Sequence, residues 1–438
     1  MHRSQRVTPW LYLRLFQPDR WLRLLGLLLS TILIVVGCQQ SSLQLSPDSS
    51  VVLELSGWGS SHTEQALLRQ VLRDFEAQHP QIKVKFEMIA DQYMDVMKTR
   101  LVGDAAPDVF YLDAVEAPLL MKSGVLEPLD AYITPEFDLS DFEENLLQPF
   151  QYQNQIYGLP KDFSTLALFY NRQAFASANL NAPPYTWDEL QAYSQQLTLD
   201  RNQDGRTDQY GMSLIPELAR QAYVIKSFGG QVVDAQDYAR FAEQPGLQGL
   251  EMLVAQYRDD RTSARPQDVG TNSGIEMFGQ GKAAMVIEGN WAIPYFADTF
   301  PALDYATAEV PVMNNQPGTM AYTVAYVMNH QSQHKAEAWE LIAYLTGKEG
   351  MEKWTSTGFA LPTRRSVAQK LRYDQDPLRS PLVAGARYAM PWQIGTYPTA
   401  VINSFNNQFI SALLGEQPLE PAIQLAQENA NQQILAAQ

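Results

Sequence analysis

Cysteine is nearly absent from this sequence, and so is any basic region large enough to bind nucleic acid. A single cysteine occurs among 438 residues, so no internal disulfide can form and packing must stabilise the fold. Acids outnumber bases, with 48 Asp and Glu against 32 Lys and Arg, which gives a formal net charge of −16. The chain therefore lacks the positive patch that nucleic-acid binding requires, and we exclude nucleic acid as a partner. No internal repeat and no long low-complexity tract is present.

The single cysteine, Cys38, stands at the end of an apolar run. The run, residues 24–36, follows five arginines and one acid and is shorter than the about 20 apolar residues of a membrane span. A basic stretch, an apolar run and a small residue before the cut are typical of a secretory signal peptide. Val35-Val36-Gly37-Cys38 resembles a bacterial lipobox, so we expect residues 1–37 to be removed and Cys38 to carry lipid. The alternative is an uncleaved anchor in which Cys38 is a small buried hydrophobe.

The rest of the chain is long enough for two lobes with sizeable cores. Residues 38–50 are polar and predict a flexible, lipidated tether in front of them. The content of 21 Tyr, 18 Phe and 8 Trp is generous for an acidic protein and favours an aromatic binding surface. Trp187 is an exception, because Thr186 and Glu189 form a capping box around it and indicate a structural role.

Alternating apolar patterns predict an α/β fold. Residues 51–55 alternate as a strand does, residues 62–78 have helical periodicity, and residues 82–86 alternate again. A strand, a helix and a strand in this order predict a parallel pair. A further short apolar strand ends at Asp113. Because ligands of open α/β sheets bind beyond the carboxyl ends of strands, Trp58 and Asp113 become candidates for ligand contact. The alternation runs to about residue 345, after which helices dominate.

A series of motifs resembles the extracellular solute-binding proteins of ABC importers, in the carbohydrate-binding group that includes maltose- and trehalose-binding proteins. The resemblance extends over about residues 51–364 and is weaker beyond them. The motifs, in chain order, are FEAQHPQIKV (75–84), APDVFYLDA (106–114), YGLPKDFSTLALFYN (157–171), TWDELQAYSQQLT (186–198), FGQGKAAMVIEGNW (278–291), KAEAWELIAYLTG (335–347) and WTSTGFALPTR (354–364).

The resemblance implies a two-lobed, type II periplasmic-binding-protein-like fold that closes by a hinge around ligand in an interlobe cleft. Its lobes would be discontinuous in sequence. The expected N-terminal lobe comprises residues 51–162 and 291–329, and the expected C-terminal lobe comprises residues 163–290 and 330–438. Residues 160–164 and 289–291 would lie near the crossovers between them.

Sugar chemistry and the resemblance together predict the ligand residues. Hydroxyl groups suit carboxylates and amides, and the apolar faces of sugar rings suit flat aromatic side chains. The predicted ligand residues are Trp58, Ser60, Glu64, Asp113, Asp162, Ser164, Trp291, Tyr322, Phe359 and Trp392.

Several of these residues have structural alternatives. Glu64 could simply complement a helix dipole, and Asp113 could be a helix N-cap. Asp162 could pair with the adjacent Lys161. Phe359 and Trp392 could be lids over the ligand or packing residues. Tyr322 stands where relatives often carry a glycine pair, which leaves the identity of the sugar open.

Two patterns raise the question of metal. The segment from Asp200 to Asp208 matches most of a calcium-binding loop and predicts a tentative site made by Asp200, Asn202, Asp204, the backbone of Arg206, and Asp208. Its twelfth position is Gly211 where calcium loops have Glu, and an Asx-rich turn is the alternative. His330 and His334 have zinc-like spacing without the accompanying motif. No cofactor is required by these patterns.

These observations predict a lipid-anchored, extracytoplasmic receptor that delivers a sugar to an ABC permease and is not an enzyme. An α-linked di- or oligosaccharide, or a glucoside, is the ligand that the resemblance implies, and a monomer is expected. A glycan hydrolase is one alternative, because Glu64, Asp113 and Asp162 could converge, although no hydrolase motif accompanies them. A receptor for a peptide or an anion is another, but the candidate pocket is poor in arginine.

Overall fold

The computed structural model describes residues 50–58 and 62–438. The predictions for the signal peptide, Cys38, almost all of the tether and Ser60 therefore lie outside the described residues. Within the part that is described, no helix is both long and apolar enough to cross a bilayer.

The described chain alternates strands and helices up to α12 and is helical beyond it except for one short strand, so the α/β prediction is confirmed. The strands are β1 (Val51–Gly57), β2 (Ile82–Met88), β3 (Val109–Asp113), β4 (Gln151–Tyr152), β5 (Gln155–Ile156), β6 (Gly158–Asn171), β7 (Tyr210–Ser213), β8 (Ser263–Ala264), β9 (Ala283–Gly289), β10 (Tyr305–Ala308), β11 (Met320–Met328) and β12 (Met390–Pro391).

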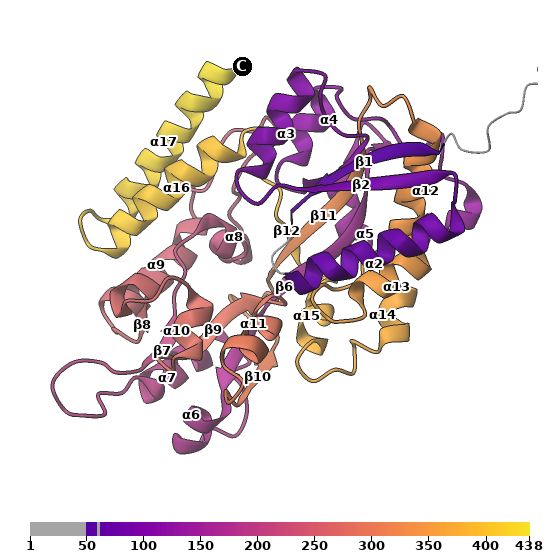
Figure 1. The fold of residues 1–438 in the computed structure, drawn as a ribbon. Coiled ribbons are helices and arrows are strands. Elements are labelled where there is room, and N and C mark those ends of the chain that lie inside the picture. Colours follow the sequence, from indigo (N-terminus) through magenta and orange to yellow (C-terminus); the bar gives the residue numbers. More distant parts are fainter. Residues whose placement is uncertain (1–49, 59–61) are drawn as a thin grey trace, which may run out of the picture. The chain divides into compact units, whose positions relative to one another are not determined.

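The helices begin with α2, which connects β1 and β2 as predicted. They are α2 (His62–Gln78), α3 (Tyr93–Val102), α4 (Ala117–Lys122), α5 (Glu144–Leu147), α6 (Arg172–Ser177), α7 (Trp187–Leu197), α8 (Leu218–Ser227), α9 (Gly246–Arg258), α10 (Gly274–Gly279), α11 (Ala292–Thr299), α12 (Lys335–Thr346), α13 (Lys348–Thr355), α14 (Arg365–Leu371), α15 (Ser380–Gly385), α16 (Pro398–Leu413) and α17 (Leu419–Ala437). The last two lie side by side (Figure 1).

The main sheet has the strand order β2-β1-β3-β11-β6-β9-β7-β8. β1 pairs in parallel with β2, which confirms the predicted strand–helix–strand unit. β11 is antiparallel to both β3 and β6, and β9 is antiparallel to β6. β1 and β2 belong to one end of this order and β7 and β8 to the other, so β6 and β11 occupy its middle (Figure 1).

β6 is the strand that joins the two halves of the sheet. Residues 158–165 of β6 pair with β11, and residues 166–170 pair with β9. The register of β6 against β11 shifts between Val324 and Ala325, and this irregularity leaves Lys161 without a paired residue. The predicted crossover at residues 160–164 is therefore a continuous strand with a local bulge.

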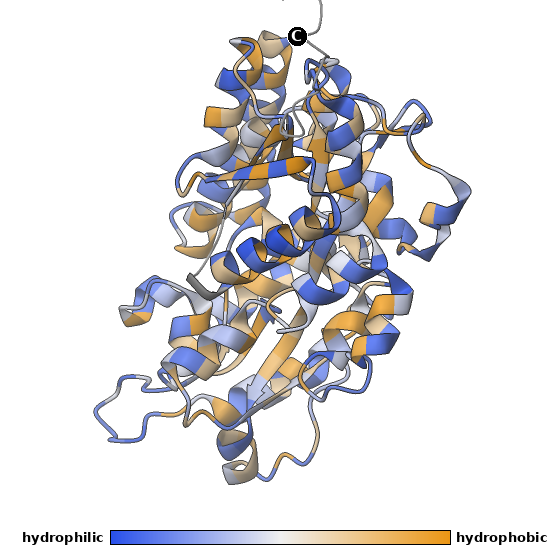
Figure 2. Cartoon of the chain, turned by 45° about the vertical axis from the view of Figure 1, so that its right-hand side comes forward, coloured by the Kyte–Doolittle hydropathy of each residue, from blue (hydrophilic) through white to orange (hydrophobic). Residues whose placement is uncertain are grey.

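Hydrophobic side chains gather in three main cores. The first core contains Leu53, Phe110 and Leu341, the second contains Leu168 and Leu250, and the third surrounds aromatic residues of β6, α10 and α11. Figure 2 shows the hydrophobic colour concentrated along the central strands, while the helices carry both hydrophilic and hydrophobic residues. Helices with one apolar face covering apolar strands are what binary patterning predicts.

Two stretches pack in a different core from the one that the expected lobe boundaries imply. α12 and α13 lie within 330–438, yet Leu341 and Trp354 belong to the first core. α11 and β10 lie within 291–329, yet Phe296 belongs to the third core and β10 pairs with the distal half of β6. The membership of the hydrophobic cores and the expected lobe boundaries therefore differ at these two stretches.

Local end signals formed as predicted. The capping box around Trp187 is complete, because the Thr186 side chain accepts from the Glu189 backbone and the Glu189 carboxylate accepts in return. Trp187 is 4 % exposed, which confirms its structural role. Gly347 ends α12 and begins α13.

Candidate ligand-binding site

The middle of the sheet brings two predicted carboxylates onto one face. Val324 of β11 pairs with Asp113 of β3 on one side and with Asp162 of β6 on the other. Paired residues on neighbouring strands point to the same face, and two strand spacings separate these carboxylates by about 10 Å. Tyr322 pairs with Ser164 two residues further along, on the same face. The sheet register thus assembles four residues that the sequence only suggested separately.

Asp113 ends β3 in an environment that disfavours its charge. Burial raises the pKa of Asp113 to about 6, and the nearby carboxylates of Glu116 and Asp162 reinforce the effect. The backbone N–H of Val115 donates to Asp113 Oδ1 at 3.1 Å. The N-cap alternative does not hold, because the residue that caps α4 is Glu116. A carboxylate at a strand end that does not cap a helix can accept hydroxyl groups of a ligand.

Asp162 lies in a cluster with a lysine and a tryptophan. Lys161, only 4 % exposed, forms an ion pair with Asp162, as the sequence alternative proposed. Trp354 of α13 donates its Nε1–H to Asp162 Oδ2 at 2.8 Å. The Lys161 ammonium also lies 4.3 Å from the ring centre of Trp354 and 4.8 Å from that of Tyr111. We call Lys161, Asp162 and Trp354 the Asp162 cluster.

Trp291 lies in a second cluster of the same composition. Its Nε1–H donates to Glu288 Oε2 at 3.0 Å, and Arg220 Nη1 lies 3.1 Å from the same oxygen. The Arg220 guanidinium stands 4.9 Å from the Trp291 ring centre. The edge of Tyr322 meets Trp291 at 5.5 Å with an interplanar angle of 69°, and the Tyr322 hydroxyl donates to the Ala219 carbonyl. We call Arg220, Glu288 and Trp291 the Glu288 cluster.

Sequence reasoning missed the two charged members of the Glu288 cluster. Glu288 lies inside a motif that was recognised for its tryptophan, so its position beside Trp291 was visible but its pairing was not. Arg220 lies on α8, outside every recognised motif, and only the fold brings it to Trp291. No sequence signal could have identified Arg220.

Asn290 connects the predicted residues Ser164 and Phe359. Its backbone N–H donates to Ser164 Oγ at 2.8 Å, and its Nδ2 donates to the carbonyls of Gly358 and Phe359, both at 2.9 Å. Ser164 is 8 % exposed, whereas Phe359 is half-buried. Asn290 thus fixes the turn at Phe359 against residues 160–164 of β6. We call this part of the strand the β6 crossing.

The other predicted aromatic residues differ in their surroundings. Trp58 is half-buried and meets Tyr93 at 5.0 Å and Tyr111 at 5.3 Å, both edge-on. Trp392 is 6 % exposed and belongs to the second core, as the packing alternative predicts. Glu64 is half-buried in the first turn of α2 and acidic there, as a helix N-terminus favours.

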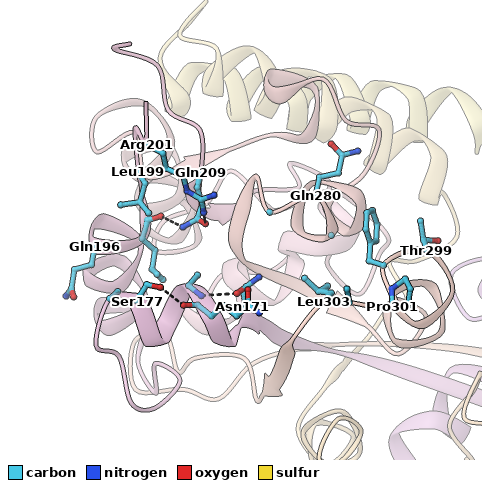
Figure 3. Close-up of a pocket in the computed structure, with 18 residues that line it drawn as sticks. Asn171, Ser177, Gln196, Leu199, Arg201, Gln209, Gln280, Thr299, Pro301 and Leu303 are labelled. Atoms are coloured by element: carbon cyan, nitrogen blue, oxygen red, sulfur yellow. Dashed lines mark hydrogen bonds between the residues drawn. The ribbon is translucent and has the colours of Figure 1, made fainter. Parts of the chain in front are cut away.

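A large surface hollow of about 760 Å³ lies away from these residues, between α6, the α10–β9 turn and the segment after α11 (Figure 3). Asn171, Gln209 and Gln280 contribute amides to its wall, and Arg201 is the one charged residue that lines it. None of the predicted ligand residues lines this hollow. We place the candidate site at the β6 crossing because the predicted carboxylates and aromatic rings gather there.

The acidic loop after α7 has the hydrogen bonding of an Asx-rich turn. Asp200 accepts from the backbone N–H groups of Asp204 and Gly205, and Asp208 accepts from that of Arg201. Asp204 accepts from the Arg206 N–H at 2.8 Å. Across the described residues, no three His, Cys, Asp or Glu side chains are grouped to hold a metal ion.

The two histidines with zinc-like spacing have different contacts. His330 Nδ1 lies 2.7 Å from Glu127 Oε2, and the backbone N–H of His334 donates to Ser332 Oγ. Of the two imidazoles, that of His330 is therefore engaged by a carboxylate.

Comparison with known proteins identifies the family. Residues 59–352 match the family of bacterial extracellular solute-binding proteins, and the chain belongs to this family. The family resemblance found in the sequence is therefore confirmed, and the protein is a solute-binding protein, not an enzyme. A hydrolase function is thereby set aside.

Known proteins resemble this chain at low sequence identity. A multiple sugar-binding protein of Streptococcus mutans is 21 % identical over 346 residues, covering 76 % of this chain and 79 % of that protein. An ABC substrate-binding protein of Listeria monocytogenes, solved with cycloalternan, has a TM-score of 0.78 at 21 % identity and covers 88 % of this chain and 99 % of that one.

A solute-binding protein of Thermotoga lettingae, solved with α-D-tagatose, has a TM-score of 0.74 at 25 % identity. The match covers 87 % of this chain and 99 % of the Thermotoga lettingae chain. The chain therefore has the mixed α/β periplasmic-binding-protein fold, as predicted.

Proposed function

We propose that this chain is the substrate-binding protein of an ABC importer and that it binds a neutral di- or oligosaccharide at the β6 crossing. The observation that carries the proposal is the gathering of Asp113, Asp162 and Tyr322 on one sheet face, with Trp291 against Tyr322. Aromatic rings beside hydrogen-bonding carboxylates are the combination that sugar recognition requires. The sugars named for the relatives support a sugar as the ligand.

The two ion pairs favour an uncharged ligand. Lys161 neutralises the charge of Asp162, and Arg220 neutralises that of Glu288, so each of these two ion pairs carries little net charge. Asp113 remains as an acceptor whose charge is disfavoured by burial. A strongly charged sugar would have to be desolvated without a matching partner, which costs more than burying hydroxyl groups.

Delivery to a permease would follow from the family and from the predicted address. A receptor must release its ligand, so a micromolar affinity of about −8 kcal/mol in total is expected. Lipid on Cys38 and the tether over residues 38–50 would keep the extracytoplasmic domain beside the permease. We expect the receptor to act as a monomer.

A thermal-shift screen over mono-, di- and oligosaccharides, with amino acids and short peptides in the same plate, tests the ligand class, because a bound ligand raises the melting temperature by mass action. The best sugar is then titrated by calorimetry into the wild type and Trp291→Ala. We expect Trp291→Ala to weaken binding at least about tenfold, since aromatic contacts dominate such sites.

Trp339→Ala is the matched control, because Trp339 is also half-buried but packs against Tyr132 and Phe137 in the first core. It should retain the wild-type affinity within about twofold. A saturable response to a peptide and to no sugar would contradict the proposal and favour a receptor for another solute.

A further inference from the structure

The side chain of Arg220 contacts Trp291 and Tyr322 and ion-pairs with Glu288. It projects from the first turn of α8, is 18 % exposed, and lies 4.9 Å from the Trp291 ring centre and 5.9 Å from that of Tyr322. A guanidinium at these distances from aromatic faces is held by cation–π attraction. The positive charge of Arg220 therefore attracts both aromatic rings.

Glu288 contacts both Arg220 and Trp291. Its side chain is only 2 % exposed, and a carboxylate buried to that degree requires strong partners. The partners are Arg220 Nη1 at 3.1 Å and Trp291 Nε1 at 3.0 Å, both at the same oxygen, Oε2. Burial raises the pKa of Glu288 while the charge of Arg220 opposes the rise. Arg220 and Trp291 are consequently joined through one carboxylate oxygen.

The orientation of the Trp291 ring is also restricted by backbone. A Cβ atom at Gly289 would lie 2.3 Å from the ring carbons of Trp291, so the indole packs directly on the glycine. With the N–H bound to Glu288, the guanidinium over the ring and Tyr322 at its side, the indole has little freedom to rotate. Ordering a side chain on binding costs conformational entropy, and an indole that is already ordered avoids this cost.

We propose that Arg220 is a positioning residue for ligand binding, which acts by fixing the Trp291 ring through Glu288 in the orientation that receives a sugar. The inference rests on the proposed function, because it presumes that Trp291 stacks on the ligand. It assigns Arg220 a role through Trp291 and no direct contact with the sugar.

A double-mutant cycle separates positioning from direct contact. Calorimetry with the best sugar compares wild type, Arg220→Met, Trp291→Phe and the double variant. We expect Arg220→Met to weaken binding about tenfold in the wild type and less than about threefold in the Trp291→Phe background, because coupled residues are not additive. Arg220→Lys keeps the charge and should restore most of the affinity.

Arg265→Met is the matched control. Arg265 also pairs with a carboxylate, Asp268, and lies 5.9 Å from the ring centre of Tyr257, and these two are its described partners. It should change the sugar affinity by less than about twofold. Because Arg220→Met leaves Glu288 buried without its cation, the pair Arg220→Met/Glu288→Gln is measured as well, and urea unfolding confirms that each variant is folded.

The outcomes separate the inference from the proposed function. Wild-type affinity in both Arg220→Met and Trp291→Ala would overturn the stacking role of Trp291 and with it the site. Wild-type affinity in Arg220→Met, with weak binding in Trp291→Ala, would overturn the positioning role alone. An equal loss in both backgrounds of the cycle would show that Arg220 touches the sugar directly, and this also overturns the positioning role.

Discussion

The Asp162 cluster and the Glu288 cluster combine the same three kinds of side chain, yet they differ in exposure. In each, a tryptophan Nε1–H donates to a carboxylate that also pairs with a cation, and the cation lies over the tryptophan ring. Trp354 is 5 % exposed and belongs to the first core, whereas Trp291 is half-buried. The same three kinds of side chain therefore hold α13 against the first core in the Asp162 cluster. In the Glu288 cluster they leave the Trp291 ring partly exposed.

The clusters also differ in how their charges meet. Lys161 and Asp162 are neighbours on β6, so their pairing needs little more than the bulge at Lys161. Arg220 and Glu288 come from α8 and β9, and their pairing depends on the packed fold. The carboxylate of Asp162 retains 15 % exposure, against 2 % for Glu288. Glu288 is thus the more buried carboxylate, whereas Lys161, 5 % exposed, is the more buried cation compared with Arg220, 18 % exposed.

The largest effect is expected from Glu288→Ala. It leaves the mostly buried charge of Arg220 without its anion, which should cost about 3–5 kcal/mol in the free energy of unfolding. Urea unfolding followed by fluorescence measures this cost. Glu288→Leu combined with Arg220→Met should recover much of it, and a double variant as unstable as Glu288→Ala would contradict the account.

Lys161→Met should cost less, about 1–3 kcal/mol, because Asp162 keeps the Trp354 donor, whereas Glu288→Ala leaves Arg220 without its anion and Trp291 Nε1 without its acceptor. The same urea experiment applies, with Lys85→Met as the control, since Lys85 pairs with Glu54 at the exposed surface and should contribute below about 1 kcal/mol. A cost above that of Glu288→Ala would show that the donor kept by Asp162 does not lower the cost of losing its cation.

The pH dependence of sugar binding should follow the ionisation of Asp113, which belongs to neither cluster. With a pKa of about 6 in the folded protein, Asp113 is mostly protonated at pH 5 and loses its capacity as an anionic acceptor. Binding to the ionised form should then weaken about tenfold between pH 7 and pH 5. Calorimetry across this range measures it, and a slope that persists in Asp113→Asn would assign the effect elsewhere.

The stability of the ligand-free protein should respond to Asp113 in the opposite direction. Its folded pKa lies above the ordinary value of 3.8, so between about pH 4 and 6 the folded state binds more protons than the unfolded state. The contribution of this group to stability therefore rises as the pH falls from 6 towards 4.

Trp354→Phe should separate the two tryptophans. It removes the Nε1–H to Asp162 while keeping an aromatic ring, so we expect a loss of about 1 kcal/mol in stability and a sugar affinity within about twofold of wild type. Trp291→Phe should instead reduce the affinity several-fold. If Trp354→Phe weakened sugar binding as much as Trp291→Phe, the division into an anchoring and a presenting tryptophan would be wrong.

The smallest effect is expected from calcium. The carboxylates of Asp200, Asp204 and Asp208 already accept backbone N–H groups, so added calcium should shift the melting temperature by less than about 1 °C relative to a chelated sample. A saturable rise would instead support the predicted calcium site at this loop.

Local patterns in the sequence predicted the elements and several contacts correctly. Periodicity predicted the β1–α2–β2 unit, the capping box predicted the start of α7, and adjacency indicated the Lys161–Asp162 pair. These features depend on residues a few positions apart, whose geometry follows directly from backbone dihedrals and side-chain reach. The lobe boundaries stay a prediction, because they depend on which core each helix covers.

The sequence by itself determined the family and the α/β class and supplied the residue types of the proposed sugar site, since each is encoded in short motifs and their order. Only the tertiary structure decided how those residues combine. The register of β3, β11 and β6 sets Asp113 and Asp162 on one sheet face, on either side of Val324. The packing of α8 brings Arg220 over Trp291. Such contacts join residues far apart in the chain, and they exist only when the apolar faces of distant elements are buried together.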